Sequence, residues 1–312
     1  MKNKKVWIVL GVVLLLIVIL YLYINREKLV VVADVTHTTE DVYLDYLFDQ
    51  VSEVEGISVD EVDFDGLTFN ERINYAIDKV KASLIVAYAS SKEMQMFAEN
   101  YKGVVFITLG ANYEEELDNL VGVKYNDYNA GYLMGYVAGK TTQSNKIGFI
   151  GTDEEIDKEF LTGYTDGALE SNSKVTISVD YMGKEYYVNG YYQDKSEEVT
   201  DEVLSYNIAT DMYNTGVDVI FENVNNSSSG VSKSASENDK FVISDCMNES
   251  DNMLACFERD FTYGLSKVVK DYNDGKLENN YVFDINNGVN VNLSDLVSEE
   301  IKTEILEIRK EM

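Results

Sequence analysis

One histidine, His37, is available to this chain of 312 residues for acid–base chemistry near neutral pH. A Ser-His-Asp or Cys-His catalytic arrangement would therefore have to include it. It lies in the segment Asp34-Val-Thr-His-Thr-Thr39, directly after a β-branched run, where a loop facing a ligand is expected. A histidine in such a loop is more often an ordinary surface residue. The sequence also has no P-loop and no Gly-x-Ser-x-Gly nucleophile elbow, so we expect a protein that is not an enzyme.

Two cysteines, Cys246 and Cys256, are too few for a disulfide scaffold, and their spacing fits no zinc motif. Two buried thiols are the commoner outcome for such a pair, and a single disulfide is the alternative outside the cell. One histidine excludes a histidine-based metal site. The glycines of 146–152 lack the spacing of a dinucleotide-binding loop. The sequence therefore predicts no metal and no cofactor.

From residue 29 onward, short apolar runs alternate with amphipathic helical segments. Runs such as Ser83–Tyr88 and Val217–Phe221 are apolar almost throughout, as in strands that are buried on both faces. Helical spacing of apolar residues fills the intervals, as in 69–80 and 156–170. This alternation predicts parallel sheets covered by helices. Two consecutive series of this kind predict two doubly wound α/β lobes.

Ligands of open α/β sheets bind at the carboxyl ends of the strands, and two facing lobes would hold a ligand between them. The loop densest in small polar residues is 223–229, which directly follows one of the expected strands. Its Asn223 and Asn225 are therefore candidate ligand contacts, together with His37 in the first loop.

Three glycines, Gly131, Gly135 and Gly139, are four residues apart and share one face of an expected helix. Each costs a helix about 1 kcal/mol relative to alanine, so a close approach by another backbone should offset them. The segment is too short and too polar to be a membrane-dimer motif. We expect this face to pack against the sheet of the second lobe.

Nineteen residues without charge, Val6–Ile24, follow a leader that contains three lysines. As a helix they span about 28 Å, close to the roughly 30 Å hydrocarbon core of a bilayer. No small-residue cleavage site follows, which predicts an uncleaved transmembrane anchor; a long signal peptide cut at an unusual site is the alternative. The lysines place the amino terminus in the cytoplasm and the rest of the chain outside it.

Beyond residue 28 the chain has 21 Lys and Arg against 54 Asp and Glu, a net charge of −33. Such a surface repels nucleic acid, so we expect no nucleic-acid partner. Solubility is the ordinary reason for an acidic balance of this kind.

Several segments, in sequence order, resemble the basic membrane protein family. These are solute-binding proteins of ABC transporters, and their known ligands are mainly purine nucleosides. The similar segments lie within roughly residues 120–295: Val123–Gly139, Ser144–Gly151, Phe160–Gly167, Gly216–Glu222, Phe241–Asp245 and Tyr281–Val289.

The resemblance implies a type I periplasmic-binding fold with three crossings between the lobes, a nucleoside-like ligand and an ABC transporter permease as partner. It implies that Phe160 stacks on the base and that Asp245 binds the ribose hydroxyls, roles that suit an apolar ring and a carboxylate. A place in the helix core is an equal alternative for Phe160. Asp34 matches the aspartate of the family's first loop, but the family's Ser-Phe-Asn is absent from 34–43. The candidate ligand-binding residues are thus Asp34, His37, Phe160, Asn223, Asn225 and Asp245.

We expect residues 1–28 to form the leader and anchor, 29–124 and 253–279 the first lobe, and 125–252 and 280–312 the second. The expected function is that of a membrane-anchored, extracytoplasmic solute-binding protein of an ABC transporter. The family also includes a membrane-associated regulator of competence gene expression. The alternative is therefore a regulatory or sensor protein on the same fold, with a diverged or lost ligand site.

Overall fold

The computed structural model describes the following residues: 12–17, 27–33, 47–55, 57–60, 66–88, 91–152, 154, 157–182, 187–188, 191–192, 201–224, 227–248 and 250–312. Apart from the helical stretch 12–17, the expected anchor Val6–Ile24 lies outside these residues. No helix within the described ranges combines the length and apolar character that crossing a bilayer requires.

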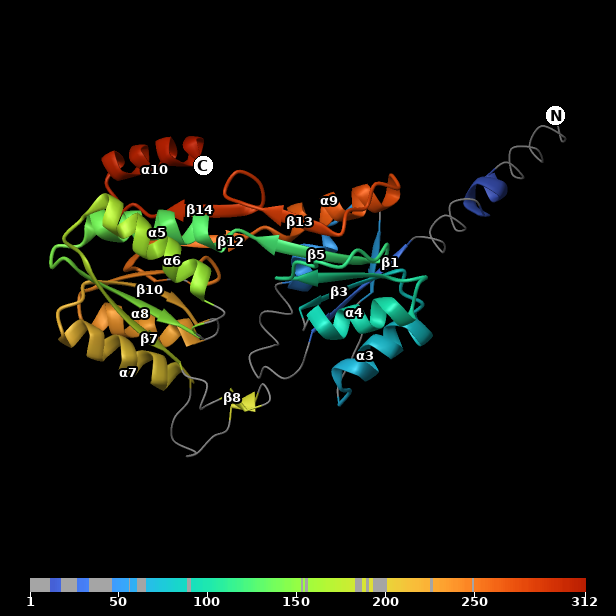
Figure 1. Cartoon of the computed structure of the whole chain (residues 1–312), viewed down its shortest axis with the longest axis horizontal. Helices are drawn as coiled ribbons and strands as arrows, with labels where there is room; N and C mark the ends of the chain where they lie inside the picture. The colour runs from blue at the N-terminus through green and yellow to red at the C-terminus, as the bar shows by residue number, and fades with distance from the viewer. Residues whose placement is uncertain are drawn as a thin grey trace.

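Two six-stranded sheets form two lobes that lie side by side (Figure 1). The first sheet has the order β13 (Asn280–Phe283), β5 (Leu120–Tyr125), β4 (Val105–Leu109), β3 (Leu84–Tyr88), β1 (Lys28–Ala33) and β2 (Ser58–Asp60). The second has the order β14 (Val289–Leu293), β12 (Met253–Arg259), β11 (Phe241–Asp245), β10 (Val219–Asn223), β6 (Lys146–Gly151) and β7 (Thr176–Tyr181). A short hairpin, β8 (Tyr187–Val188) and β9 (Tyr191–Tyr192), is separate from both.

Each sheet starts with a strand, adds the second strand on one side and then builds four strands outward on the other. This order is doubly wound, as expected, and its switch points lie between β1 and β3 and between β6 and β10. Every pairing in the two sheets is parallel except that of β12 with β14. Near-continuous apolar strands explain the parallel pairing, because helices cover both faces.

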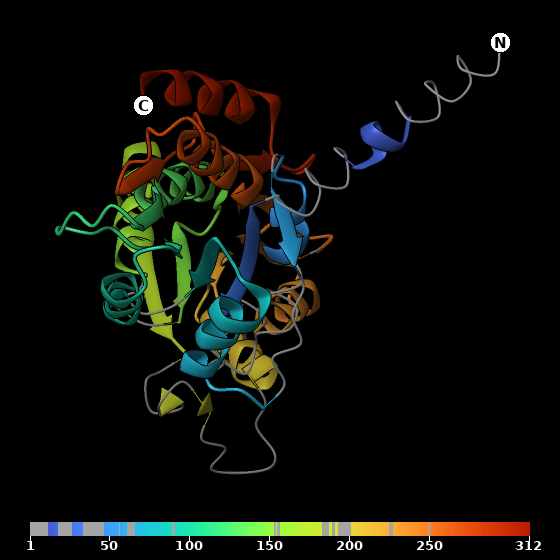
Figure 2. The same cartoon turned by 90° about the vertical axis from the view of Figure 1, so that its right-hand side faces the viewer.

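Among the described residues, the first lobe carries a helical stretch at 47–52, α3 (Phe69–Tyr75), its π-helical continuation η1 (Ala76–Val80), α4 (Ser91–Asn100) and α9 (Phe261–Asn273). The second lobe carries α5 (Asp127–Thr141), α6 (Lys158–Ser171), α7 (Asp201–Asn214), α8 (Ser228–Glu237) and α10 (Glu299–Glu311). Local sequence fixes their ends: Thr68 and Glu71 form a capping box at the start of α3, and Ser298 caps α10. Figures 1 and 2 both place α10 on the outside of the second lobe.

The chain crosses between the lobes three times: from β5 into α5, from β12 into α9, and from β13 into β14. Backbone hydrogen bonds join the crossings, since the Asn126 amide donates to the Phe283 carbonyl at 2.7 Å and the Asp260 amide to the Gly288 carbonyl at 2.8 Å. The three crossing segments are therefore neighbours in space. They give the arrangement of a periplasmic-binding fold.

The expected lobe boundaries differ from the observed sheets at the last two crossings. The segment 253–259 was expected in the first lobe, but β12 pairs with β11 in the second sheet. The segment 280–283 was expected in the second lobe, but β13 pairs with β5 at the edge of the first. Apolar content cannot distinguish two sheets of the same kind, because membership depends on pairing between distant segments.

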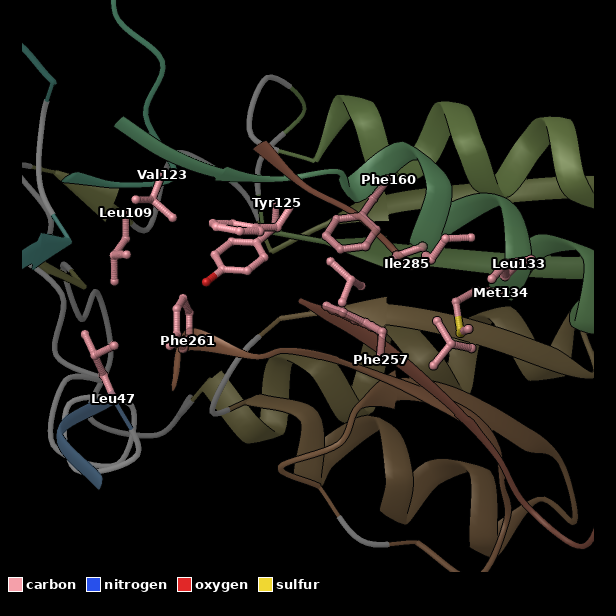
Figure 3. Close-up of a cluster of buried hydrophobic side chains, with 14 of the residues drawn as sticks. Leu47, Leu109, Val123, Tyr125, Leu133, Met134, Phe160, Phe257, Phe261 and Ile285 are labelled. Carbon is pink, nitrogen blue, oxygen red and sulfur yellow. The ribbon is translucent and has the colours of Figure 1, made fainter. Parts of the chain in front are cut away.

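A continuous apolar cluster runs from the first lobe through the crossings into the second (Figure 3). Leu47 and Leu109 lie at one end, Tyr125 and Phe261 in the middle, and Phe160 with Phe257, Leu133 and Met134 at the other. Separate clusters fill the α3/α4 face of the first sheet and the α7/α8 face of the second.

The glycine face of α5 packs closely on another backbone, as expected, but the partner is helix α6 and not the sheet. A Cβ on Gly135 would lie 2.7 Å from the carbonyl carbon of Tyr164 and closer still to its oxygen. Gly131 meets Phe160 of α6 in the same way. On the α6 side, Gly163 and Gly167 meet the backbone of Tyr128 and Tyr132. Glycines on both helices thus allow the two backbones to touch.

Candidate ligand-binding site

The carboxyl ends of both sets of parallel strands face the crossings between the lobes. Strand β5 ends at Tyr125 and β12 at Arg259, and each leads directly into a crossing. Strands β3 and β4 run parallel to β5, and β10 and β11 run parallel to β12, so they end on the same side. This is the place where a doubly wound sheet binds its ligand.

Three of the six candidate residues, Asp34, His37 and Asn225, lie outside the described residues. The other three are described and belong to the second lobe. Asn223 is the last residue of β10, Asp245 is the last residue of β11, and Phe160 is in the first turn of α6. The structure thus brings these three toward the carboxyl ends of the strands in the second sheet.

Asp157 links the loops after β6 and β10, at the switch point of the second sheet. Its carboxylate is fully buried and accepts hydrogen bonds from the Thr152 amide at Oδ2 and from Asn223 Nδ2 at Oδ1, both 2.6 Å. The Thr152 hydroxyl donates to the Asn223 carbonyl at 3.0 Å. Asn223 is therefore held by the protein itself, so its amide orientation is fixed before any ligand arrives.

Asp245 offers a half-buried carboxylate at the end of β11. Its Oδ1 accepts hydrogen bonds from the Met247 amide and from Asn248 Nδ2, both at 2.9 Å. Burial raises the pKa of Asp245, while these hydrogen bonds and the positive charge of Arg259 oppose the shift. A carboxylate has about four lone-pair positions, so Asp245 can accept further protons from hydroxyl or amino groups.

Glu222, on the adjacent strand β10, is a buried carboxyl group that is 1% exposed. It accepts hydrogen bonds from the Val224 amide at 3.1 Å, from the Ser228 hydroxyl at 2.9 Å and from the Ser244 hydroxyl. Burial, and next the negative charge of Asp245, raise the pKa of Glu222 to about 8. At neutral pH this side chain is therefore a neutral, internally bonded acid behind Asp245.

Phe160 lies in the core, with 1% of its surface exposed. Its ring centroid is 4.8 Å from that of Phe257 and 5.6 Å from that of Phe221. Figure 3 shows the Phe160 and Phe257 side chains directed toward one another from α6 and β12. In this structure the Phe160 ring therefore packs in the core beneath helix α6, which was the alternative to a role in base stacking.

Arg259, the last residue of β12, lies over both rings of this aromatic pair. Its guanidinium carbon lies 5.4 Å from the Phe160 ring centroid and 5.5 Å from that of Phe257. One guanidinium nitrogen forms a 2.8 Å ion pair with Asp127, and the arginine side chain stays 26% exposed. A cation over two rings and beside a carboxylate is held firmly in place.

Cys246 and Cys256 form a disulfide, where two buried thiols had been the commoner expectation. Their Cα atoms are 4.9 Å apart, because β11 and β12 are neighbours in which Ser244 pairs with Cys256. Cys246 directly follows Asp245, and its amide donates to the Phe257 carbonyl at 2.9 Å. The disulfide therefore ties the Asp245 loop to the strand that carries Arg259.

Asp157, Glu222 and Arg259, which lie beside the described candidates, were not among the candidate residues named from the sequence. A signal for two of them was present, because Glu222 and Arg259 follow the apolar runs 217–221 and 253–257, at the carboxyl ends where ligands bind. Asp157 precedes a helical segment and looks like an ordinary N-cap. Its side chain makes no cap hydrogen bond and reaches across to Asn223 instead.

A family model described as ABC transporter substrate-binding protein, PnrA-like, matches residues 71–311, which include strands of both sheets. Curated relatives match over shorter segments. The CD4+ T-cell-stimulating antigen of Listeria monocytogenes is 34% identical over 119 residues, 38% of this chain and 29% of the relative. The ABC transporter nucleoside-binding protein BmpA of Lactococcus lactis subsp. cremoris is 28% identical over 136 residues, 43% of this chain and 33% of the relative. These matches thus span about a third or less of the relatives' own length.

Solved structures share the fold over nearly the whole chain. A solute-binding protein of an ABC transporter system from Conexibacter woesei has a TM-score of 0.69 at 17% identity, covering 91% of this chain and 95% of its own. A transcriptional activator of the comK gene from Bacillus halodurans has a TM-score of 0.71 at 18% identity, covering 90% and 95%. At these identities the likeness establishes the two-lobed fold alone.

Proposed function

We propose, because the chain belongs to the Bmp family of PnrA-like ABC transporter substrate-binding proteins, that it binds a nucleoside-like molecule between its lobes and presents it to a transporter permease. One observation carries the proposal: the family match extends across both sheets and includes all three crossings. The relative from Lactococcus that is named for nucleoside binding supports this choice of ligand class.

The described half of the site supplies groups that suit such a ligand. Asp245 accepts protons from hydroxyl groups such as those of a ribose. Asn223 lies at the switch point of the second sheet, held in place by Asp157. We include Asp34, His37 and Asn225 in the proposal as contacts from the loops after β1 and β10.

We also propose that Val6–Ile24 anchors the protein in the cell membrane, with the two lobes outside the cytoplasm. The disulfide between Cys246 and Cys256 supports an oxidising location, since disulfides persist mainly outside the cytosol. An extracytoplasmic position is also where a substrate-binding protein meets its solute.

Calorimetric titration of the full chain with adenosine, inosine and uridine tests the ligand class. We expect saturable binding of at least one of them, and a nucleoside at 100 times its Kd should add about 2.7 kcal/mol to the free energy of unfolding. Asp245→Asn should weaken binding by about 1–3 kcal/mol, because a charge-assisted acceptor is lost. Asp180→Asn, at an exposed position on edge strand β7, is the matched control and should bind as the parent does. A folded chain that binds none of the three nucleosides would contradict the proposal.

A second candidate is a membrane-bound regulatory or sensor protein on the same fold. Packing favours it in one respect, because Phe257 and Arg259 already cover Phe160 and occupy the surface on which a base would stack. The solved comK activator from Bacillus halodurans has the same fold. Failure to bind any nucleoside, together with a change in target-gene expression on deletion, would favour this candidate.

A further inference from the structure

We propose that the disulfide between Cys246 and Cys256 is a redox switch: reduction by a dithiol loosens the loop that begins at Asp245 and lowers the affinity for the solute. The inference rests on the proposed binding function and adds a means of regulation to it. It requires no contact between the cysteines and the ligand, because the disulfide acts through the position of Asp245.

The loop between β11 and β12 is unusually short for its task. Seven residues, 246–252, join two neighbouring strands that run parallel. Such a connection usually takes about a dozen residues or more, because the chain must return along the length of the strand before it can pair again. The position of this loop is therefore set mainly by the contacts that hold its two ends.

The two ends are held by different kinds of contact. At the far end, the Asn252 side chain donates to the Lys240 carbonyl at 2.7 Å, and the Asn252 carbonyl accepts from the Val242 amide at 3.1 Å. At the near end, the disulfide links the loop covalently to the middle of β12. Reduction leaves the far end and the strand pairing in place, so the change stays local and the lobe remains folded.

Asp245 belongs to the near end, which the disulfide controls. Its Oδ1 accepts hydrogen bonds from the Met247 amide and from Asn248 Nδ2, both at 2.9 Å, and Asn248 also donates to the Ser244 hydroxyl at 3.2 Å. The orientation of the carboxylate therefore depends on residues directly next to Cys246. Once the disulfide is broken, these residues gain freedom that a ligand must remove again on binding, which costs affinity.

The sulfur atoms are placed where a thiol can attack them. Both cysteines are half-buried, and Cys256 pairs with the exposed Asn292 on edge strand β14. One thiolate of a dithiol attacks a sulfur and breaks the disulfide, and the other sulfur leaves as a thiolate that takes up a proton. The second thiol of the reagent then releases the mixed disulfide. The protein gains two electrons and two protons, and the dithiol is oxidised to its own disulfide.

Calorimetric titration of the full chain with adenosine, before and after treatment with dithiothreitol, tests the switch. Reduction should weaken binding by about three- to tenfold, as for the renewed ordering of one or two side chains, and reoxidation should restore it. A tenfold preference for the oxidised form also requires adenosine to lower the midpoint potential of the disulfide by about 30 mV. The double variant Cys246→Ser, Cys256→Ser is the control, and its affinity should not respond to dithiothreitol.

Amide hydrogen exchange gives a readout that needs no ligand. Reduction should speed exchange at Met247 and Asn248 and leave the Val242 amide unchanged. Unchanged exchange at Met247 and Asn248 would overturn the inference, and so would faster exchange throughout the second lobe, because the disulfide would then be a general staple. A parent chain that binds no nucleoside overturns the proposed function and, with it, the control of binding. Parental binding that reduction does not alter overturns the inference alone.

Discussion

Glu222 shows how one buried carboxyl group links stability to pH. Its pKa is about 8 in the folded protein, raised by burial and then by Asp245, against an ordinary value of 4.5. Between these values the folded chain holds a proton that the unfolded chain releases. The stabilisation that protonated Glu222 gives to the folded state is therefore complete below about pH 4.5. It is lost as the pH rises through about 8.

Substitution of Glu222 by glutamine should remove this dependence. A glutamine can accept from Val224 and Ser228 through its oxygen and donate to Ser244 through its amide, and it stays neutral at every pH. We expect the melting temperature of Glu222→Gln, relative to the parent, to increase between pH 5 and about pH 8 and then to level off. Glu307→Gln on the exposed face of α10 is the control. Parallel melting curves for parent and Glu222→Gln over this range would show that Glu222 does not titrate as described.

Phe160 belongs to the core, so its truncation should lower the free energy of unfolding. Phe160→Ala removes a ring packed against Phe221 and Phe257, and we expect the free energy of unfolding to fall by about 3–5 kcal/mol in urea titrations. Met96→Ala on α4, at a position that is 46% exposed, should change it by much less. A loss below about 1 kcal/mol for Phe160→Ala would mean that the ring is not part of the core. Loss of binding in this variant would reflect packing as much as ligand contact.

At the scale of elements, the α5–α6 pair depends on backbone contact through glycine. In an exposed helix, Gly→Ala stabilises by up to about 1 kcal/mol. At Gly135 the new Cβ would collide with the Tyr164 backbone, so we expect Gly135→Ala to destabilise by about 1–3 kcal/mol or more. Gly103→Ala has open space around its Cβ and is the control. A higher melting temperature for Gly135→Ala would contradict the helix contact.

Most elements were predictable because their evidence is local. The apolar run 217–221 became β10, and the helical spacing in 156–170 became α6, each displaced by about two residues. The glycine face of α5 indicated a close contact. It could not identify α6 as the partner, because periodicity shows which face is buried and not what buries it.

The site was less predictable because its geometry depends on pairing between distant strands. The disulfide forms because β11 lies beside β12, a fact of sheet order that the spacing of Cys246 and Cys256 does not contain. Arg259 reaches Phe160 because the end of β12 meets the start of α6. An arginine and a phenylalanine that far apart in sequence give no sign of their contact.

At the scale of the whole molecule, the proposed membrane anchoring and orientation of the chain can be tested directly. The lysine-rich leader and Val6–Ile24 predict that the acidic lobes lie outside the cytoplasm. Protease added to intact cells stripped of their wall should digest the lobes, while a cytoplasmic marker protein survives. Protection of the lobes would contradict the orientation, and release of a shortened soluble form would contradict an uncleaved anchor.

The place of β13 at the edge of the first sheet has a consequence for biosynthesis. This strand pairs with β5, yet the chain reaches it after nearly the whole second lobe. While the ribosome makes the intervening residues, β5 lacks its outer neighbour and exposes unpaired backbone groups, which invite pairing with other chains. The first lobe is thus begun first and finished almost last, so the nascent chain carries an open strand edge through about half of its translation.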